Sequence, residues 1–230
     1  MDIDQYSKLD NPVWYALNET HQAFSRGSGD IRAYVSDVAP FVGFENQNGP
    51  ADLDDGYIAD LDSFFIVGTK PLLPGHIWAE LELKCLQMVC LNPVEMEISE
   101  EIVPLTERHN QELVDLVNLV QPGLFREKTR LMGQYYGIFK DGKLVSITGE
   151  RIKMNDFTEV SAVITHPDYV GKGLAKQLVA HVTNNILAQG SVPYLHVLDT
   201  NERAIGLYEK LGYVSRRNIT FWKVNNLMLG

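Results

Sequence analysis

The stretch from Thr158 to Leu178 reads TEVSAVITHPDYVGKGLAKQL. Its β-branched and apolar start predicts a strand, His166-Pro167 ends that strand, and Gly171 and Gly173 predict a tight loop. Apolar residues then recur at every fourth position, which predicts a helix, at Leu174, Leu178, Val182 and Ile186. The order is therefore a strand, a short loop and a helix N-terminus.

The start of this predicted helix is suited to an anion. The first turn of a helix leaves backbone N–H groups unpaired, and the peptide dipoles make that end partly positive. A glycine has no Cβ, so a ligand can approach its backbone closely. Gly171 and Gly173 alone fit an ordinary strand-to-helix turn equally well. Lys172 and Lys176 add positive charge to the same turn, and we therefore expect a bound phosphate or pyrophosphate.

The composition excludes several classes of protein. The chain has 230 residues, 45% of them hydrophobic, which is enough for a packed core. A net charge of −10 argues against nucleic-acid and anionic-membrane binding, because both need a basic face. Neither an apolar run of membrane-spanning length nor a secretory signal at Met1–Asp4 is visible. We therefore expect a cytoplasmic protein.

The cysteines and histidines give no metal or disulfide signal. Cys85 and Cys90 lie five positions apart in a predicted strand over Trp78 to Leu91. That spacing points them to opposite faces, so we expect two buried free thiols. The histidines lack a spacing such as His-Glu-x-x-His, and no metal site is expected.

A joint is predicted near Asn92-Pro93, which a run of glutamates follows. It divides the chain into residues 1–94, with weaker signals, and residues 95–230, with clear ones. The second part is predicted to contain a strand over 98–105, a helix after Thr106, a short helix over 125–132, a hairpin turning at Asp141-Gly142, the quoted stretch, a strand over 194–198, a helix from Asn201 and two strands within 213–224.

Two motifs carry a resemblance to a known family. VITHPDYVGKGLA begins at Val163, and NERAIGLYEKLGY begins at Asn201. In this order and separation, with the hairpin in front, they resemble the acyl-CoA-dependent GNAT superfamily of N-acetyltransferases over about residues 95–224. The resemblance implies an α/β fold: a mixed, mostly antiparallel sheet with helices on both faces and two splayed central strands. Residues 1–94 would then be an accessory α/β segment or a degenerate GNAT-like half, which walls the acceptor pocket or makes a homodimer contact.

The resemblance also implies a site for acetyl-CoA as the cosubstrate. The pyrophosphate would bind loop amides, and the pantetheine arm would follow the strand and contact Asn201, which is also a good helix N-cap. The family usually has Arg or Gln where this chain has Val170, so the loop is expected to bind through backbone amides and lysine charge. The implied cofactor-binding residues are Val163, Ile164, Thr165, Val170, Gly171, Lys172, Gly173, Leu174, Ala175, Lys176, Asn201, Ala204 and Tyr208.

Two residues are candidates for acid–base chemistry. An aliphatic amine with a pKa of about 10 must lose a proton before it attacks a thioester. Strand alternation predicts that Glu159 shares a face with Ser161, Val163 and Thr165, where it could act as the base; its alternatives are a solvent-facing carboxylate or recognition of a cationic substrate. The resemblance implies that Tyr208 protonates the departing CoA thiolate, with core packing as its alternative role.

We therefore expect an enzyme that transfers acetyl from acetyl-CoA to a primary amine of a small molecule or peptide by direct attack in a ternary complex. Amino acids, polyamines, antibiotics and protein N-termini all remain open as acceptors, and the net negative charge mildly favours cationic ones. A non-catalytic acyl-CoA-binding regulatory module and a protein–protein scaffold are the alternative hypotheses, because a fold alone does not establish activity.

Overall fold

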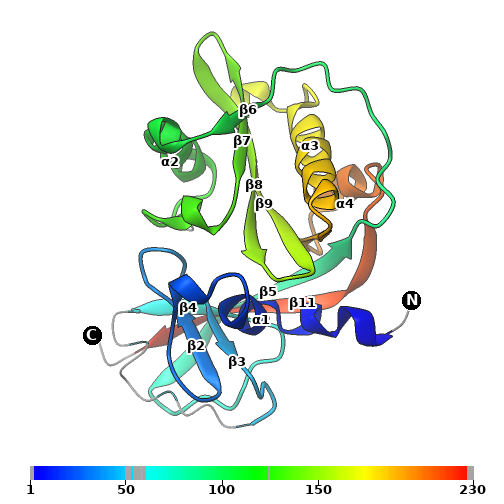
Figure 1. Ribbon diagram of the computed structural model, residues 1–230. Helices are drawn as coiled ribbons and strands as arrows, with labels where there is room; N and C mark the ends of the chain where they lie inside the picture. Colours follow the sequence, from blue (N-terminus) through cyan, green and yellow to red (C-terminus); the bar gives the residue numbers. More distant parts are fainter. Residues whose placement is uncertain (1–2, 50–52, 54–57, 59–60, 124, 227–230) are drawn as a thin grey trace.

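The computed structural model describes residues 3–49, 53, 58, 61–123 and 125–226 (Figure 1). Its main feature is an eight-stranded sheet. In spatial order the strands are β4 (Ser63–Val67), β11 (Val214–Asn226), β5 (Ile77–Val89), β10 (Val192–Leu198), β9 (Phe157–Thr165), β8 (Lys143–Lys153), β7 (Tyr135–Lys140) and β6 (Val103–Leu105). Among the described strand pairs of this sheet, only β9–β10 is parallel.

Helices cover both faces of this sheet. Figure 1 shows α2 (Asn110–Val120) on one side of β8 and β9, and α3 (Leu174–Ala188) on the other. The short helix α4 (Glu202–Glu209) packs in the same apolar cluster as α3. All four residues of the predicted helical stripe on α3 are buried, since they face the sheet. The predicted α/β fold, a mixed and mostly antiparallel sheet with helices on both faces, is confirmed.

The first part of the chain contributes to the same sheet. It forms the short helical turns η1 (Ile3–Asp10) and η2 (Gln22–Phe24), the helix α1 (Pro12–Asn18) and a small sheet of β1 (Ser25–Arg26), β2 (Ile31–Tyr34) and β3 (Val42–Phe44). Its strand β5 lies between β11 and β10 and pairs with β11 over most of its length. The predicted joint after residue 94 therefore lies between two strands of one sheet, and the division into two units stays a prediction.

Local turn chemistry explains the hairpin between β7 and β8. Asp141 and Gly142 have φ of 50° and 73°, as the two central residues of a tight hairpin turn require. The predicted hairpin is therefore present. Between β9 and α3 the chain makes one short turn, η5 (Pro167–Tyr169).

Four predictions about the elements differ in extent from the structure. The strand predicted over 98–105 is confined to β6, and the short helix predicted over 125–132 is the 3-10 turn η4 (Thr129–Met132). After Thr106 a 3-10 turn, η3 (Glu107–His109), precedes α2. The two strands predicted within 213–224 are one strand, β11, whose register shifts between Ser215 and Arg217. A bulge absorbs the local irregularity and lets the strand continue.

The two cysteines lie in different apolar clusters. Cys85 and Cys90 are both free and buried, as expected. Among the residues described, every helix is too short or too polar to cross a bilayer.

Candidate active site

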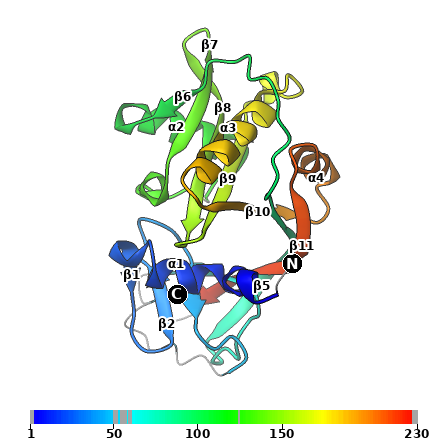
Figure 2. The same cartoon turned by 45° about the vertical axis from the view of Figure 1, so that its right-hand side comes forward.

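The strands β9 and β10 separate halfway along the sheet. They pair only where Val192–Tyr194 lies beside Phe157–Glu159. Beyond this point β10 continues beside β5, while β9 stays beside β8, and the two strands point in clearly different directions (Figure 2). Residues 161–165 of β9 therefore have no strand partner on the side of β10, and their backbone edge is free for a ligand.

A bulge in β9 marks the start of this free edge. Ala162 has a φ of 50°, and one extra residue of β9 lies between the pairs Ile147–Ile164 and Gly149–Ser161. The extra residue reverses the strand's alternation, because side chains alternate between faces at every position. The common face predicted for Glu159, Ser161, Val163 and Thr165 is therefore wrong: the first two residues lie on the face opposite to the last two.

A cavity of about 950 Å³ occupies the opening. Its lining comes from the apolar clusters on both faces of the sheet, so it passes between β9 and β10. We call one end the helix half, lined by Val163, Thr165, Val170, Gly171, Gly173, Leu174, Ala175, Lys176, Asn201, Ala204 and Tyr208, among others. We call the other end the strand half, lined by Leu83, Cys85, Gln121, Arg151, His196 and Phe221.

The structure brings most of the predicted cofactor-binding residues together in the helix half. Ile164 and Lys172 are the exceptions. The side chain of Ile164 is buried in the cluster that faces α2. The ammonium of Lys172 lies 4.3 Å from the centroid of the Tyr169 ring instead of in the cavity.

The loop before α3 presents unpaired backbone donors. Gly171 and Gly173 have φ of 86° and 77°, and a Cβ on either would meet no atom within 4 Å. Within the described chain, no acceptor is found for the N–H groups of Gly171, Gly173 and Leu174, and the N-cap Gly173 provides no side-chain cap. Helix N-termini with such donors bind phosphate groups, so the loop fits a diphosphate.

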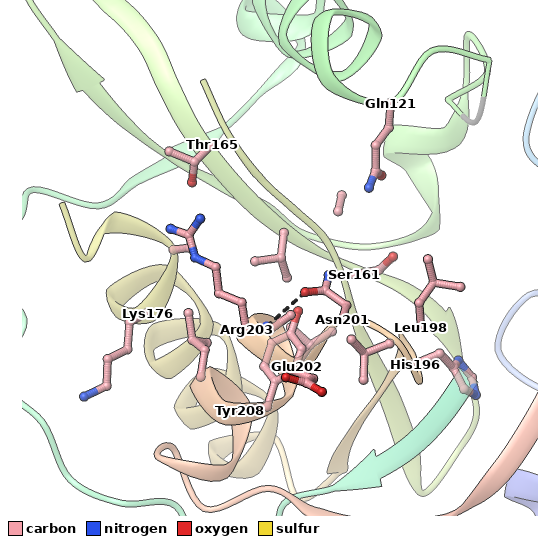
Figure 3. Close-up of a pocket in the computed structure, with 18 of the residues that line it drawn as sticks. Gln121, Ser161, Thr165, Lys176, His196, Leu198, Asn201, Glu202, Arg203 and Tyr208 are labelled. Carbon is pink, nitrogen blue, oxygen red and sulfur yellow. Dashed lines mark hydrogen bonds between the residues drawn. The ribbon is translucent and has the colours of Figure 1, made fainter. Parts of the chain in front are cut away.

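Asn201 and Tyr208 lie on the opposite wall of the helix half. The side-chain oxygen of Asn201 accepts a hydrogen bond of 3.1 Å from the N–H of Ala204, the dashed line in Figure 3, which is the predicted N-cap contact. Tyr208 is 7% exposed, and burial raises the pKa of its phenol to about 12. Figure 3 also shows the side chain of Arg203 reaching from α4 between Thr165 and Lys176.

Behind the strand half, Glu159 is part of a buried charge network. Its carboxylate accepts hydrogen bonds from Nε and Nη2 of Arg151, at 2.8 and 2.7 Å, and from Nδ1 of His196, at 2.7 Å. The N–H of Ile152 donates a fourth bond. Burial tends to raise the pKa of Glu159, but the Arg151 guanidinium and the His196 hydrogen bond outweigh it and hold that pKa well below its usual range.

These contacts do not fit the predicted role of Glu159 as a base. Both carboxylate oxygens are already engaged, the side chain is 1% exposed, and Glu159 does not line the cavity. A carboxylate with a strongly lowered pKa also has little affinity for a proton. Glu159 therefore holds Arg151 and His196 in position.

Gln87 fixes the tautomer of His196. The amide nitrogen of Gln87 donates to the carbonyl of Leu9 at 2.7 Å, and its oxygen accepts from Arg216 at 2.8 Å. The same nitrogen lies 3.1 Å from Nε2 of His196, which must therefore accept. His196 therefore donates from Nδ1 to Glu159.

The sequence-based prediction missed the strand half almost entirely. Arg151, His196, Phe221 and the pair Leu83 and Cys85 come from four different strands, and no motif links them. The one available signal was the opposite charge of Arg151 and Glu159 on neighbouring strands, which often marks a cross-strand pair.

Comparison with solved structures identifies the family. One solved structure is of a protein from Novosphingobium aromaticivorans that is described as an acetyltransferase from the GNAT family. That protein is 32% identical to this chain, and the two structures align with a TM-score of 0.84 over 95% of this chain and 98% of that one. This chain belongs to the GNAT family. A GCN5-related N-acetyltransferase from Kribbella flavida, 16% identical with a TM-score of 0.56 over 92% of this chain and 95% of that one, shares the fold.

Sequence relatives match a shorter part of this GNAT-family chain. The family model described as FR47-like protein matches residues 135–222. An acetyltransferase of Yersinia pestis strain Pestoides F is 37% identical over 60 residues, which are 25% of this chain and 42% of that protein. An acetyltransferase of Pectobacterium atrosepticum matches over the same shares at 37% identity. The match thus spans under half the length of these curated relatives.

No set of three or more His, Cys, Asp or Glu side chains among the described residues is arranged to hold a metal ion.

Proposed function

We propose that this protein transfers the acetyl group of acetyl-CoA to a primary amine of a small molecule or peptide. One observation carries the proposal: a free strand edge and a loop of unpaired amides meet in one cavity that continues through the sheet. Family membership supports acetyl transfer as the reaction, and the cavity offers separate places for donor and acceptor.

The helix half fits acetyl-CoA. The amides of Gly171, Gly173 and Leu174 would hold the diphosphate, and the edge of β9 at Val163 and Thr165 would hold the pantetheine arm through backbone hydrogen bonds. Lys176 and Arg203 line the same region and add the positive charge that Val170 does not supply. The thioester would then lie at the bulge, facing the strand half.

Direct attack by the amine is favoured over a covalent acyl-enzyme. Cys85 is the cysteine that lines the cavity, and burial raises the pKa of its thiol to about 11. At neutral pH it is protonated and a poor nucleophile. The amine would therefore attack the thioester itself, with proximity in the ternary complex providing much of the acceleration.

The chain's own groups assist at two points. A backbone N–H near Val163 would stabilise the charge on the carbonyl oxygen. Tyr208, with a pKa of about 12, stays protonated at physiological pH and would donate a hydrogen bond to the departing sulfur. Because Glu159 is not available, the proton of the amine would pass to solvent through the open cavity.

A thiol-release assay with acetyl-CoA and a panel of amines tests this proposal. We expect free CoA to form only when an acceptor is present. The alternative, a non-catalytic acyl-CoA-binding module, predicts that CoA binds and that no acceptor releases thiol. The net charge of −10 favours a small or peptide acceptor over a nucleic acid.

A further inference from the structure

The guanidinium of Arg151 is only partly used by its ion pair. Its Nε and Nη2 atoms donate to Glu159, while Nη1 has no partner within the described chain. The Arg151 side chain is 24% exposed against 1% for Glu159. Arg151 lines the cavity and Glu159 does not, so the cavity meets the positive member of the pair.

Packing holds Arg151 in this orientation. The centre of its guanidinium lies 5.2 Å from the ring centroid of Phe41 and 6.0 Å from that of Phe221. Stacking on rings and a two-bond contact with a carboxylate leave few alternative rotamers. The free N–H groups are therefore preorganised for a ligand in the strand half.

The rest of the lining also disfavours a cationic acceptor. The cavity-lining residues include four cationic side chains, Arg151, Lys176, Arg203 and Lys210, and one acidic side chain, Glu202. Glu202 belongs to α4, in the helix half. The other polar groups of the strand half, on Gln121 and His196, carry no negative charge. Among the described residues, no acid that lines the strand half is thus open to an ammonium group.

We infer that Arg151 binds a carboxylate carried by the acyl acceptor, so that the acceptors are amino acids or short peptides rather than polyamines or simple amines. This inference rests on the proposed acetyl transfer and adds the acceptor class. A guanidinium binds carboxylates through paired, charge-assisted hydrogen bonds, and such bonds are about twice as strong as neutral ones. The same chemistry would also suit the terminal carboxylate of a dicarboxylic acyl group.

The first test uses the unmodified protein. Glycine, β-alanine and 4-aminobutyrate are each compared with the corresponding carboxamide in the thiol-release assay with acetyl-CoA. Loss of a hydrogen-bonded charged partner typically costs a factor of about ten to a hundred, and we expect this preference in kcat/KM for at least one amino acid over its amide. These three acceptors differ in the number of carbon atoms between the amine and the carboxylate, so the best of them reports the distance from Arg151 to the thioester.

The second test uses paired variants. Arg151→Gln together with Glu159→Gln removes both charges and leaves no buried charge unpaired. We expect the carboxylate preference to fall to within about twofold while CoA affinity is kept. Arg203→Gln is the matched control: it removes a cation of the helix half, and should raise the KM for acetyl-CoA while the carboxylate preference persists.

Each contrary result has its own meaning. Equal rates for acids and amides, or a preference that survives the double variant, overturn the inference and leave acetyl transfer intact. Faster transfer from succinyl-CoA than from acetyl-CoA to amines without a carboxylate would mean that Arg151 binds the carboxylate of the acyl group. That result would also overturn the inference about the acceptor. If no acceptor releases thiol, calorimetric titration of CoA-bound protein with N-acetylglycine and N-acetylglycinamide still decides: tighter binding of the acid supports the inference, and equal or absent binding contradicts it.

Discussion

The two halves of the cavity are built in different ways. The helix half combines the free backbone edge of β9 and the unpaired amides of the loop before α3 with side chains of α3 and α4. The strand half consists of side chains from four strands that are distant in sequence and of Gln121 after α2, next to the network of Arg151, Glu159 and His196. The comparison teaches that backbone groups in one local stretch can be recognised from a sequence motif, whereas a site of side chains from distant strands needs the fold.

The largest effect is expected where the strand half loses a charge. Arg151→Met leaves the Glu159 carboxylate buried and without its main partner, which should lower the free energy of unfolding by about 3–5 kcal/mol. Denaturant titration measures the loss. Adding Glu159→Gln should restore much of it, and a double variant as unstable as the single one would show that the network is not what stabilises this half.

Low pH should also destabilise the apolar cluster that packs against the strand half. His21 donates to the carbonyl of Met132 and accepts from the hydroxyl of Tyr34, and burial lowers its pKa from 6.5 to about 4. As the pH falls, His21 takes up its proton in the unfolded chain at a higher pH than in the folded protein. The contribution of His21 to the free energy of unfolding is therefore complete above pH 6.5 and decreases as the pH drops toward 4, by about 3 kcal/mol in total. Glu159 has a lowered pKa, so its own contribution is lost only below its unfolded value of 4.5.

Unfolding curves at several pH values between 7 and 4.5 measure this effect. In His21→Gln the slope in this window should flatten, although the variant is less stable overall. An unchanged slope would place the titrating group elsewhere.

For the helix half, the largest effect should be on turnover. Tyr208→Phe removes the hydrogen bond that we propose to the leaving sulfur, and kcat should fall by about a hundredfold, within the range usual for general acids. CoA affinity should stay within about twofold because the ring is retained. Steady-state kinetics and calorimetry separate the two quantities, and a loss of affinity with unchanged kcat would assign Tyr208 a packing role only.

The smallest effect should come from adding a charge at the loop. Val170 is 45% exposed at the helix half, so Val170→Arg can be accommodated without repacking. The new guanidinium should tighten CoA binding by up to about tenfold, as one added charge-assisted hydrogen bond allows. Val170→Gln should give a smaller gain, and no change in either variant would indicate that backbone amides and existing cations already satisfy the diphosphate.

The same comparison explains what could be predicted from the sequence. The strand, the glycine loop, α3 and α4 are local patterns, so the helix half was predicted residue by residue, apart from the side chains of Ile164 and Lys172. The bulge at Ala162 has no local signature, and it reversed the predicted face of Glu159. The insertion of β5 beside β10 is a long-range pairing, and for this reason Cys85 was predicted to be buried but not to line a cavity.

The central claim is that the helix half binds CoA independently of the charges beside the strand half. Titration calorimetry of CoA, with the wild-type protein and with the double variant Arg151→Gln, Glu159→Gln, tests this claim most directly. The account predicts saturable binding of one CoA to each chain, with dissociation constants that agree within about twofold, because the unpaired amides of the helix half are intact in both. If the folded wild-type protein gives no heat with CoA or acetyl-CoA, or if only the double variant fails to bind, the account is contradicted.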